Sequence, residues 1–169
     1  MSISTGMGDN GSTEIIGGKR LAKNHPLVEC LGTIDELNAF LGDAKVAMAD
    51  TQAYKRRQLI EEIQKELFAI SGIIAGSAAQ VPDAENLTAL IAEIESTLPP
   101  VVGFAVPGAH AVSAKLHIAR TVCRRTERRL LSMGRPETIT AEDYSLLSVW
   151  FNRLSDLLFL MAREEDARH

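Results

Sequence analysis

The first residues of the chain that could do chemistry are residues 6–11, which read GMGDNG, a literal G-x-G-x-x-G string. Glycines in such a loop let backbone N–H groups converge on an anion. A dinucleotide-binding loop also needs a buried strand before it and a helix after it, whereas only MSIST precedes Gly6 and turn-like sequence follows Gly11. A Walker A loop is excluded as well, because the GK pair at residues 18–19 is followed by arginine. The segment is either an anion-binding loop or a flexible tail, and further donors or charges would come from Ser12, Thr13, Lys19, Arg20 and Lys23.

The second candidate is ARTVCRRTERRLL at residues 119–131. At about 100° per residue, Arg120, Arg124 and Arg128 lie along one side of a helix and Glu127 lies beside them. Such a run is typical of a solvated face with helical ion pairs. However, Arg120 and Arg124 border the apolar stripe, where an arginine without a carboxylate or phosphate partner is costly. The pattern therefore predicts a buried counter-charge beside this stripe, which comprises Ala119, Val122, Cys123, Thr126, Leu130 and Met133.

Composition limits the possible partners. With 169 residues, of which 46% are apolar, the chain predicts a single domain with a proper core. Lys and Arg total 18 against 22 Asp and Glu, and this mildly acidic balance argues against nucleic acid or an anionic membrane as a partner. The sequence shows neither a signal-peptide pattern nor an apolar run of membrane-spanning length, so we expect a cytoplasmic protein.

Metal and disulfide chemistry finds little support in the residues. Cys30 and Cys123 are isolated, each within an apolar helical pattern, and we interpret both as small buried hydrophobic residues. The histidines show no ligand spacing and no Glu-x-x-His pair occurs, which excludes a ferritin-like di-iron bundle. We therefore predict no metal held by the protein itself.

The elements that must position these residues are helices. Residues 1–25 are rich in glycine and show little periodicity, which predicts an arm, whereas the rest of the chain has apolar residues at spacings of three and four and no convincing strand alternation. This pattern predicts an all-α fold, an antiparallel five-helix bundle over residues 26–166 with a glycine-rich N-terminal arm. The expected helices run from Pro26 to about Asp50, through Leu59 to Ile74, from Pro82 to Pro99, from Val112 to Met133, and from Thr140 to about Arg163.

Several blocks of this sequence together resemble one known family, the PduO-type ATP:cob(I)alamin adenosyltransferases. The blocks are GDNGST, GGKRLAK, GTIDELNAFLG, FAVPG, HIARTVCRRTERR and FNRLSDLLFLMAR, in the family's order and spacing, and they cover nearly the whole chain. The resemblance implies a single domain over residues 1–169 that forms a homotrimer with active sites between neighbouring subunits. It also implies that the arm folds over the triphosphate of ATP.

The resemblance assigns the ATP site residue by residue. Arg124 and Asn152 match positions that contact the triphosphate, and Glu127 would hold an arginine in place. Arg120 matches an arginine that pairs across the subunit interface with the aspartate of the DEL motif, here Asp35. On the residues alone, Asp35 is equally a solvated charge and Asn152 a surface amide. The arm positions implied to line the ATP site are Thr5, Gly8, Asp9, Gly11, Ser12, Thr13 and Lys23.

The implied reaction is attack by Co(I) of reduced cobalamin on the 5′ carbon of ATP, which gives adenosylcobalamin and triphosphate. The basic residues and a Mg²⁺ ion bound through the ATP phosphates would neutralise the leaving group. Phe104 matches a phenylalanine that occupies the lower face of the corrin, although a core plug in a loop is a rival interpretation. His117 is assigned to the cobalamin site as a packed or interface histidine rather than a metal ligand. A cobalamin reductase or an adenosylcobalamin-dependent enzyme would be a possible partner.

The chain departs from the family pattern at two places. Gly6 and Met7 stand where a basic residue and then Thr or Asn are usual, and Ala109 and His110 follow Pro-Gly where glycine and then Ser or Thr are usual. The first change removes a charge that would face phosphate, and the second alters a loop near the corrin. A trimeric carrier or sensor of cobalamin or nucleotide, with weak or no transferase activity, is therefore kept as the alternative function.

Overall fold

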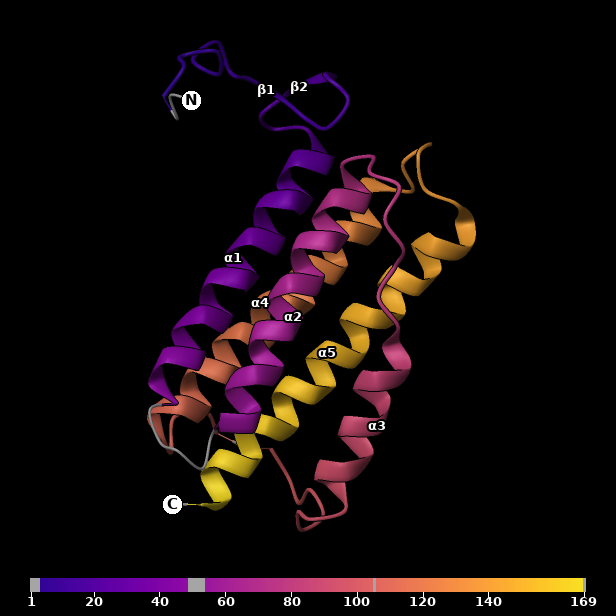
Figure 1. The fold of residues 1–169 in the computed structure, drawn as a ribbon. Coiled ribbons are helices and arrows are strands. Elements are labelled where there is room, and N and C mark those ends of the chain that lie inside the picture. Colours follow the sequence, from indigo (N-terminus) through magenta and orange to yellow (C-terminus); the bar gives the residue numbers. More distant parts are fainter. Residues whose placement is uncertain (1–3, 49–53, 105, 169) are drawn as a thin grey trace.

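The fold is a helical bundle with a small β-hairpin in the arm (Figure 1). The computed structural model describes residues 4–48, 54–104 and 106–168. The long helices lie side by side, and the arm projects beyond the N-terminal end of the first helix, at the opposite end of the bundle from the C-terminus (Figure 1). The elements are β1 (Ser12–Glu14), β2 (Arg20–Ala22), α1 (Pro26–Ala47), α2 (Tyr54–Ile74), α3 (Ala84–Glu95), α4 (Ala111–Met133) and α5 (Ala141–Ala167).

The hairpin corrects the expectation that the chain has no strand. Strands β1 and β2 pair antiparallel, with Thr13 opposite Leu21. Gly17 and Gly18 form the turn with φ of +87° and +79°, a conformation that glycine adopts at no steric cost. Strands of three residues are too short to show an alternating pattern, so periodicity could not reveal them. The all-α prediction is thus confirmed, and the short hairpin of the arm is an addition to it.

The helices begin and end at residues with clear capping chemistry. The Thr140 side chain accepts a hydrogen bond from the backbone N–H of Asp143 at 3.0 Å, and the Asp83 side chain caps α3 in the same manner. Gly134, with φ of +71°, follows the last residue of α4. Helix α5 continues four residues beyond the predicted Arg163 to Ala167, and the predicted end of the first helix near Asp50 lies outside the described residues.

The core forms where α1, α4 and α5 pack together around Trp150 and Phe151, whose rings meet edge to face at 5.2 Å. The predicted stripe of α4 is buried as expected, except that Met133 is only half-buried. Cys30 and Cys123 are buried free thiols, which confirms their interpretation as core residues. Burial raises the pKa of Cys30 to about 12 and raises that of Cys123 as well, so both remain thiols at neutral pH.

One ion pair ties the start of α2 to the end of α5. Arg56 donates from Nε and Nη2 to the two carboxylate oxygens of Glu164, at 2.9 and 3.1 Å. The side chains are only 15% and 18% exposed. Because both donors lie in the plane of the guanidinium, the carboxylate is held in a two-point grip that fixes the two helices relative to each other. Arg168 approaches the same carboxylate at 3.3 Å.

We expect Glu164→Gln to lower the free energy of unfolding by about 1.5 to 3 kcal/mol, the usual value of hydrogen bonds to charged groups. The amide loses the charge and turns an N–H₂ group toward one arginine donor. Urea unfolding followed by circular dichroism measures the change. Glu61→Gln is the matched control, since the Glu61–Lys65 pair lies on an exposed face of α2, and an equal loss in both variants would contradict the assignment.

Candidate active site

The arm folds onto itself around a small pocket. The pocket has a volume of about 220 Å³ and is lined by Thr5, Met7, Gly8, Ser12, Thr13, Glu14 and Arg20. Four of the residues predicted to line an ATP site, Thr5, Gly8, Ser12 and Thr13, therefore meet in one place. Thr5, Ser12 and Thr13 contribute hydroxyl groups and Arg20 a positive charge, which suit an anion, while Glu14 adds a carboxylate to the same lining.

Arg20 holds the two sides of this pocket together. Its Nη2 donates to the backbone oxygen of Met7 at 2.7 Å and to the hydroxyl of Ser12. Asn10 accepts from both the backbone N–H and the hydroxyl of Ser12, at 3.1 and 2.7 Å. The prediction counted Arg20 among basic residues of the arm but gave it no position in the site. Arg20 is the first residue of β2, and a strand of three residues leaves no pattern in the sequence that would have revealed this position.

One glycine of the arm is favoured by its positive φ, and another is closely packed. A Cβ at Gly8 would lie 3.3 Å from Lys23 Nζ and 3.4 Å from the backbone oxygen of Ser12. Gly11 has φ of +79°, and its backbone oxygen accepts from the N–H of Lys23 at 2.9 Å. The predicted residues Gly8, Gly11 and Lys23 thus lie together in the arm. Asp9 is exposed, and its backbone N–H donates to the Gly6 oxygen at 3.1 Å.

The arginines of α4 divide into two groups. Arg125 pairs with Glu36, and Arg129 lies 3.4 Å from Glu29, so these two arginines join α4 to α1. The other three form no ion pair with any residue that the structure describes. The chain itself therefore leaves an uncompensated row of positive charge along α4, made up of Arg120, Arg124 and Arg128.

Arg120 is half-buried, and its Nε donates to Nδ1 of His117 at 3.3 Å. His117 is only 4% exposed and packs against Phe159, with ring centroids 6.1 Å apart. Burial lowers the pKa of His117, as does the charge of Arg120, whereas Asp166 acts in the opposite direction. A histidine so covered within one chain offers little surface to a cobalamin.

The remaining polar site residues lie apart from the arm. Asp35 is exposed on α1, and Asn152 is half-buried on α5, where its Oδ1 accepts from Arg153 at 3.0 Å. Glu127 is half-buried but forms no ion pair with a described residue, so the helical pairs considered for it are not present within this chain. Between described residues, no hydrogen bond or ion pair joins the arm to Arg124 or Asn152.

Phe104 is fully exposed on the connector between α3 and α4. The alternative interpretation of Phe104 as a core plug is therefore wrong for the single chain. Val101, Val102 and Val106 are exposed on the same connector, and Arg163 anchors its start by donating to the Pro99 oxygen at 2.6 Å. Exposed apolar residues gathered in this way mark a surface that binds something apolar.

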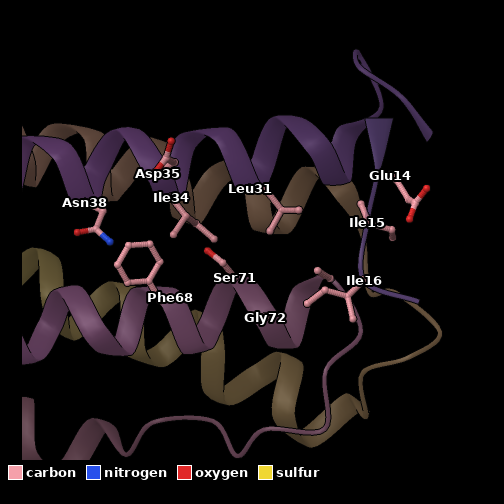
Figure 2. Close-up of a pocket in the computed structure, with 11 residues that line it drawn as sticks. Glu14, Ile15, Ile16, Leu31, Ile34, Asp35, Asn38, Phe68, Ser71 and Gly72 are labelled. Atoms are coloured by element: carbon pink, nitrogen blue, oxygen red, sulfur yellow. The ribbon is translucent and has the colours of Figure 1, made fainter. Parts of the chain in front are cut away.

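A larger pocket opens between α1 and α2, where the arm meets the bundle (Figure 2). Its volume is about 450 Å³, and Phe68 of α2 lies opposite Ile34 and Asn38 of α1 while Ile15 and Ile16 of the arm lie at its end (Figure 2). The Asn38 side chain donates to the Gln64 backbone oxygen at 3.3 Å, and the Gln64 side chain donates to the Asn38 backbone oxygen at 3.0 Å. Sequence reasoning missed this pocket, although a phenylalanine away from the apolar stripe of α2 was a signal for it.

The bundle and its arm thus combine arginines that lack ion pairs among the described residues with an exposed apolar connector. The comparison of sequences makes the class specific. A family model described as cobalamin adenosyltransferase matches residues 3–165, and the chain therefore belongs to that family. The resemblance inferred from the sequence blocks is thereby confirmed.

Relatives of known name support the same family. The corrinoid adenosyltransferase PduO of Citrobacter freundii is 39% identical over 175 residues, which cover 98% of this chain and 50% of the relative. The PduO of Salmonella typhimurium is 38% identical, with 99% and 50% covered. The chain thus spans about half the length of these two relatives. A second corrinoid adenosyltransferase of Citrobacter freundii is 39% identical, with 97% of this chain and 94% of the relative covered.

Solved structures agree with the bundle described above. A variant PduO-type ATP:corrinoid adenosyltransferase from Lactobacillus reuteri, complexed with cobalamin and ATP, matches with a TM-score of 0.86 and 32% identity. The match covers 98% of this chain and 94% of that chain. Another variant of that enzyme, complexed with ATP, matches with a TM-score of 0.85 and 33% identity over 98% of this chain and 94% of that chain.

We expect Arg20→Met to loosen the arm without weakening the bundle, because the bonds of Arg20 all lie within residues 7–12 of the arm. Hydrogen exchange of residues 4–23 should become faster, while the thermal unfolding of the helices stays unchanged. Lys19→Met is the matched control, since it removes a neighbouring charge but not these bonds. Unchanged exchange in Arg20→Met would show that the hairpin alone orders the arm.

Proposed function

We propose that this chain transfers the 5′-deoxyadenosyl group of ATP to the cobalt of cob(I)alamin, releasing triphosphate. The observation that carries the proposal is the row of α4 arginines that the chain leaves without a carboxylate, together with an arm whose pocket suits phosphate. Arg124 is exposed and has no carboxylate partner among the described residues, and the triphosphate of ATP would supply the anion that its charge can bind. The names of the relatives and the ATP and cobalamin bound in similar structures support this choice of substrates.

We propose further that the active site is completed by a second copy of the chain in a homotrimer. Among the described residues, no hydrogen bond or ion pair joins the arm to Arg124 or Asn152, and the arm of a neighbouring subunit would bring its phosphate pocket to these two residues. Asp35 is exposed and without an ion pair among the described residues, which leaves it available to Arg120 of a neighbour. This arrangement supplies the carboxylate that Arg120 lacks in its own chain.

In this proposal the protein positions ATP and neutralises the charge of the triphosphate, and none of its side chains acts as the nucleophile. The nucleophile is the cobalt of the substrate, so no general base is needed. Arg124, Asn152 and Lys23 bind the triphosphate and stabilise the charge that develops as it departs. The arm residues Thr5, Gly8, Asp9, Gly11, Ser12 and Thr13 close over the polyphosphate and exclude water, while Glu127 orients an arginine in the assembled site.

Mg²⁺ fits this site through ATP rather than through the protein. Among the described residues, no group of three or more His, Cys, Asp or Glu side chains could hold a metal ion. Mg²⁺ is usually bound through substrate phosphates with one or two carboxylates, and it would add positive charge to the triphosphate. The role of the chain is then to bind and orient the phosphates that carry the ion.

The apolar connector is assigned to the corrinoid. Phe104, with its neighbouring valines, presents the kind of exposed apolar surface that the flat face of a corrin ring would cover. A ring placed under the cobalt would displace the lower axial ligand, and axial ligation is a main determinant of a metal's reduction potential. We place His117 behind this region, where it contributes through its neighbours.

A cytoplasmic location and an electron-donating reductase, or an adenosylcobalamin-dependent enzyme, as partner remain predictions. No described helix is long and apolar enough to cross a membrane.

The direct test is an anaerobic assay of the purified chain with chemically reduced cobalamin and Mg²⁺–ATP. We expect adenosylcobalamin and triphosphate to form in equal amounts. Binding of both substrates without product would instead favour the carrier or sensor, for which the departures at Gly6 and Met7 give a reason. Absence of binding would overturn both.

We expect Arg124→Lys to lower kcat/KM by about 10- to 100-fold, less than the loss when a transition-state donor is removed outright. Lysine keeps the charge but loses the planar fork that grips two phosphate oxygens. Arg128→Lys is the matched control, as another exposed and unpaired arginine of α4. Steady-state kinetics would decide, and an unchanged kcat/KM in Arg124→Lys would place Arg124 outside the phosphate site.

Phe104→Ala should separate cobalt chemistry from folding. Because the side chain is fully exposed, we expect the free energy of unfolding to change by no more than about 0.5 kcal/mol, as for ordinary surface substitutions. ATP affinity should also stay unchanged, while the optical signature of four-coordinate Co(II) disappears and preformed Co(I) restores part of the rate. An intact signature in Phe104→Ala would remove Phe104 from the corrinoid site.

A further inference from the structure

Two buried polar atoms at the contact between α4 and α5 have no hydrogen-bond partner among the described residues. They are Nε2 of His117, on α4, and Oδ1 of Asp166, on α5. Buried donors and acceptors without a partner are rare and costly, so each such atom calls for an explanation. The charge of Asp166 acts on the imidazole of His117, which indicates that the two side chains lie near each other.

The bond to Arg120 fixes the state of the ring. The Nε–H of an arginine only donates, so Nδ1 of His117 must be an acceptor without a proton. A neutral imidazole then carries its proton at Nε2, the atom without a partner. Oδ1 of Asp166 is an acceptor in need of a donor. The two orphan atoms therefore have complementary chemistry, although no hydrogen bond joins them in the structure.

The same bond determines where the guanidinium of Arg120 can point. Since Nε is bound to His117, the side chain is anchored on the side that faces α5, and Nη1 together with the outer N–H of Nη2 is directed away from that anchor. Those nitrogens form no hydrogen bond or ion pair with a described residue. They are available to an anion that lies outside this chain.

We propose that His117 is a positioning residue, which holds Arg120 in its active orientation through Nδ1, while the charge of Asp166 acts on the ring from α5. The inference rests on the proposed function, in which Arg120 meets Asp35 of a neighbouring subunit at the active site. It gives the chain a bonded pair, His117 and Arg120, that leads from the contact between α4 and α5 to the proposed intersubunit site, with Asp166 in the last turn of α5. His117 acts through Arg120 and need not touch either substrate.

Protonation of His117 would break the bond between His117 and Arg120, whereas the neutral ring keeps it. Adding a proton at Nδ1 turns the acceptor into a donor and places a second positive charge against Arg120, so the anchor is lost. The charged groups that act on the ring are Arg120 on its own helix and Asp166 on α5, and Phe159 of α5 adds only an apolar surface. On α1, the other helix packed on α4, Asp43 is paired with Lys115 at 2.6 Å.

Two variants of similar shape separate positioning from packing. His117→Asn keeps an acceptor near the place of Nδ1 but cannot be protonated, whereas His117→Leu keeps bulk and removes the acceptor. We expect His117→Leu to lower kcat/KM about 10- to 100-fold, as for outer partners of catalytic groups, and His117→Asn to recover most of that loss. Thermal unfolding of both shows whether the difference is structural. Equal kcat/KM in the two variants would overturn the proposal.

The pH profile gives a readout that packing alone would not move. Wild type should lose kcat/KM as the pH falls through the depressed pKa of His117, below its usual value of 6.5. His117→Asn should lack this acid limb. Asp166→Asn keeps an acceptor but removes the charge that favours the protonated ring, so its limb should move to lower pH. A limb that persists in His117→Asn, or that moves upward in Asp166→Asn, would overturn the proposal.

A measurement that requires no activity separates this inference from the proposed function. Two-bond ¹H–¹⁵N spectra of the ¹⁵N-histidine-labelled protein at pH 7.5 should show His117 as the neutral Nε2–H tautomer. A cationic ring, or the Nδ1–H tautomer, would overturn the inference even if the protein is an active transferase. The expected tautomer in a protein that forms no adenosylcobalamin would leave the His117–Arg120 anchor standing and refute the proposed function instead.

Discussion

The structure depends on how it neutralises the arginines of α4. Five arginines lie within ten residues of a helix whose other face forms the core, and positive charges beside a core are stable only with a counter-charge. Helix α1 supplies carboxylates to Arg125 and Arg129, and these pairs join the two helices. The remaining three arginines are left for something outside the chain. Arg125 and Arg129 therefore stabilise the contact between α4 and α1, whereas the other three arginines are available to bind an anion from outside the chain.

The structure of the arm does not depend on the arginines of α4, because the arm is ordered by its own contacts. Its hairpin and the bonds of Arg20 close a pocket suited to phosphate, yet no described contact brings that pocket to Arg124. A rigid bundle and a separately folded arm can meet across a subunit boundary without either changing its internal structure. The geometry of the single chain thus gives a physical reason why this family, as the resemblance implies, would assemble before it acts.

The sequence was informative where a pattern extended over many residues and silent where a feature needed tertiary register. Helical periodicity predicted the bundle and the buried stripe of α4, and the grouping of Thr5, Gly8, Ser12 and Thr13 followed from the family blocks. The hairpin escaped because its strands have three residues each. The exposure of Phe104 could not be deduced, since an apolar residue in a loop is compatible with either a core or a surface. The packing of His117 against Phe159 depends on how α4 aligns with α5, which no local pattern records.

The exposed side chain of Phe68 and the carboxylate of Asp35, which has no ion pair among the described residues, line the same pocket beside α1. Phe68 is 67% exposed beside the pocket that Asp35 and Asn38 help to line, and the arm residues Ile15 and Ile16 lie at its end (Figure 2). Apolar surface of this kind is stabilised when a partner covers it. In the proposed trimer, a neighbour whose Arg120 reached Asp35 would also bring the apolar flank of its α4 toward this pocket. Charge pairing would then set the register of the interface, and burial of Phe68 would contribute most of its stability, because exposed ion pairs alone contribute little.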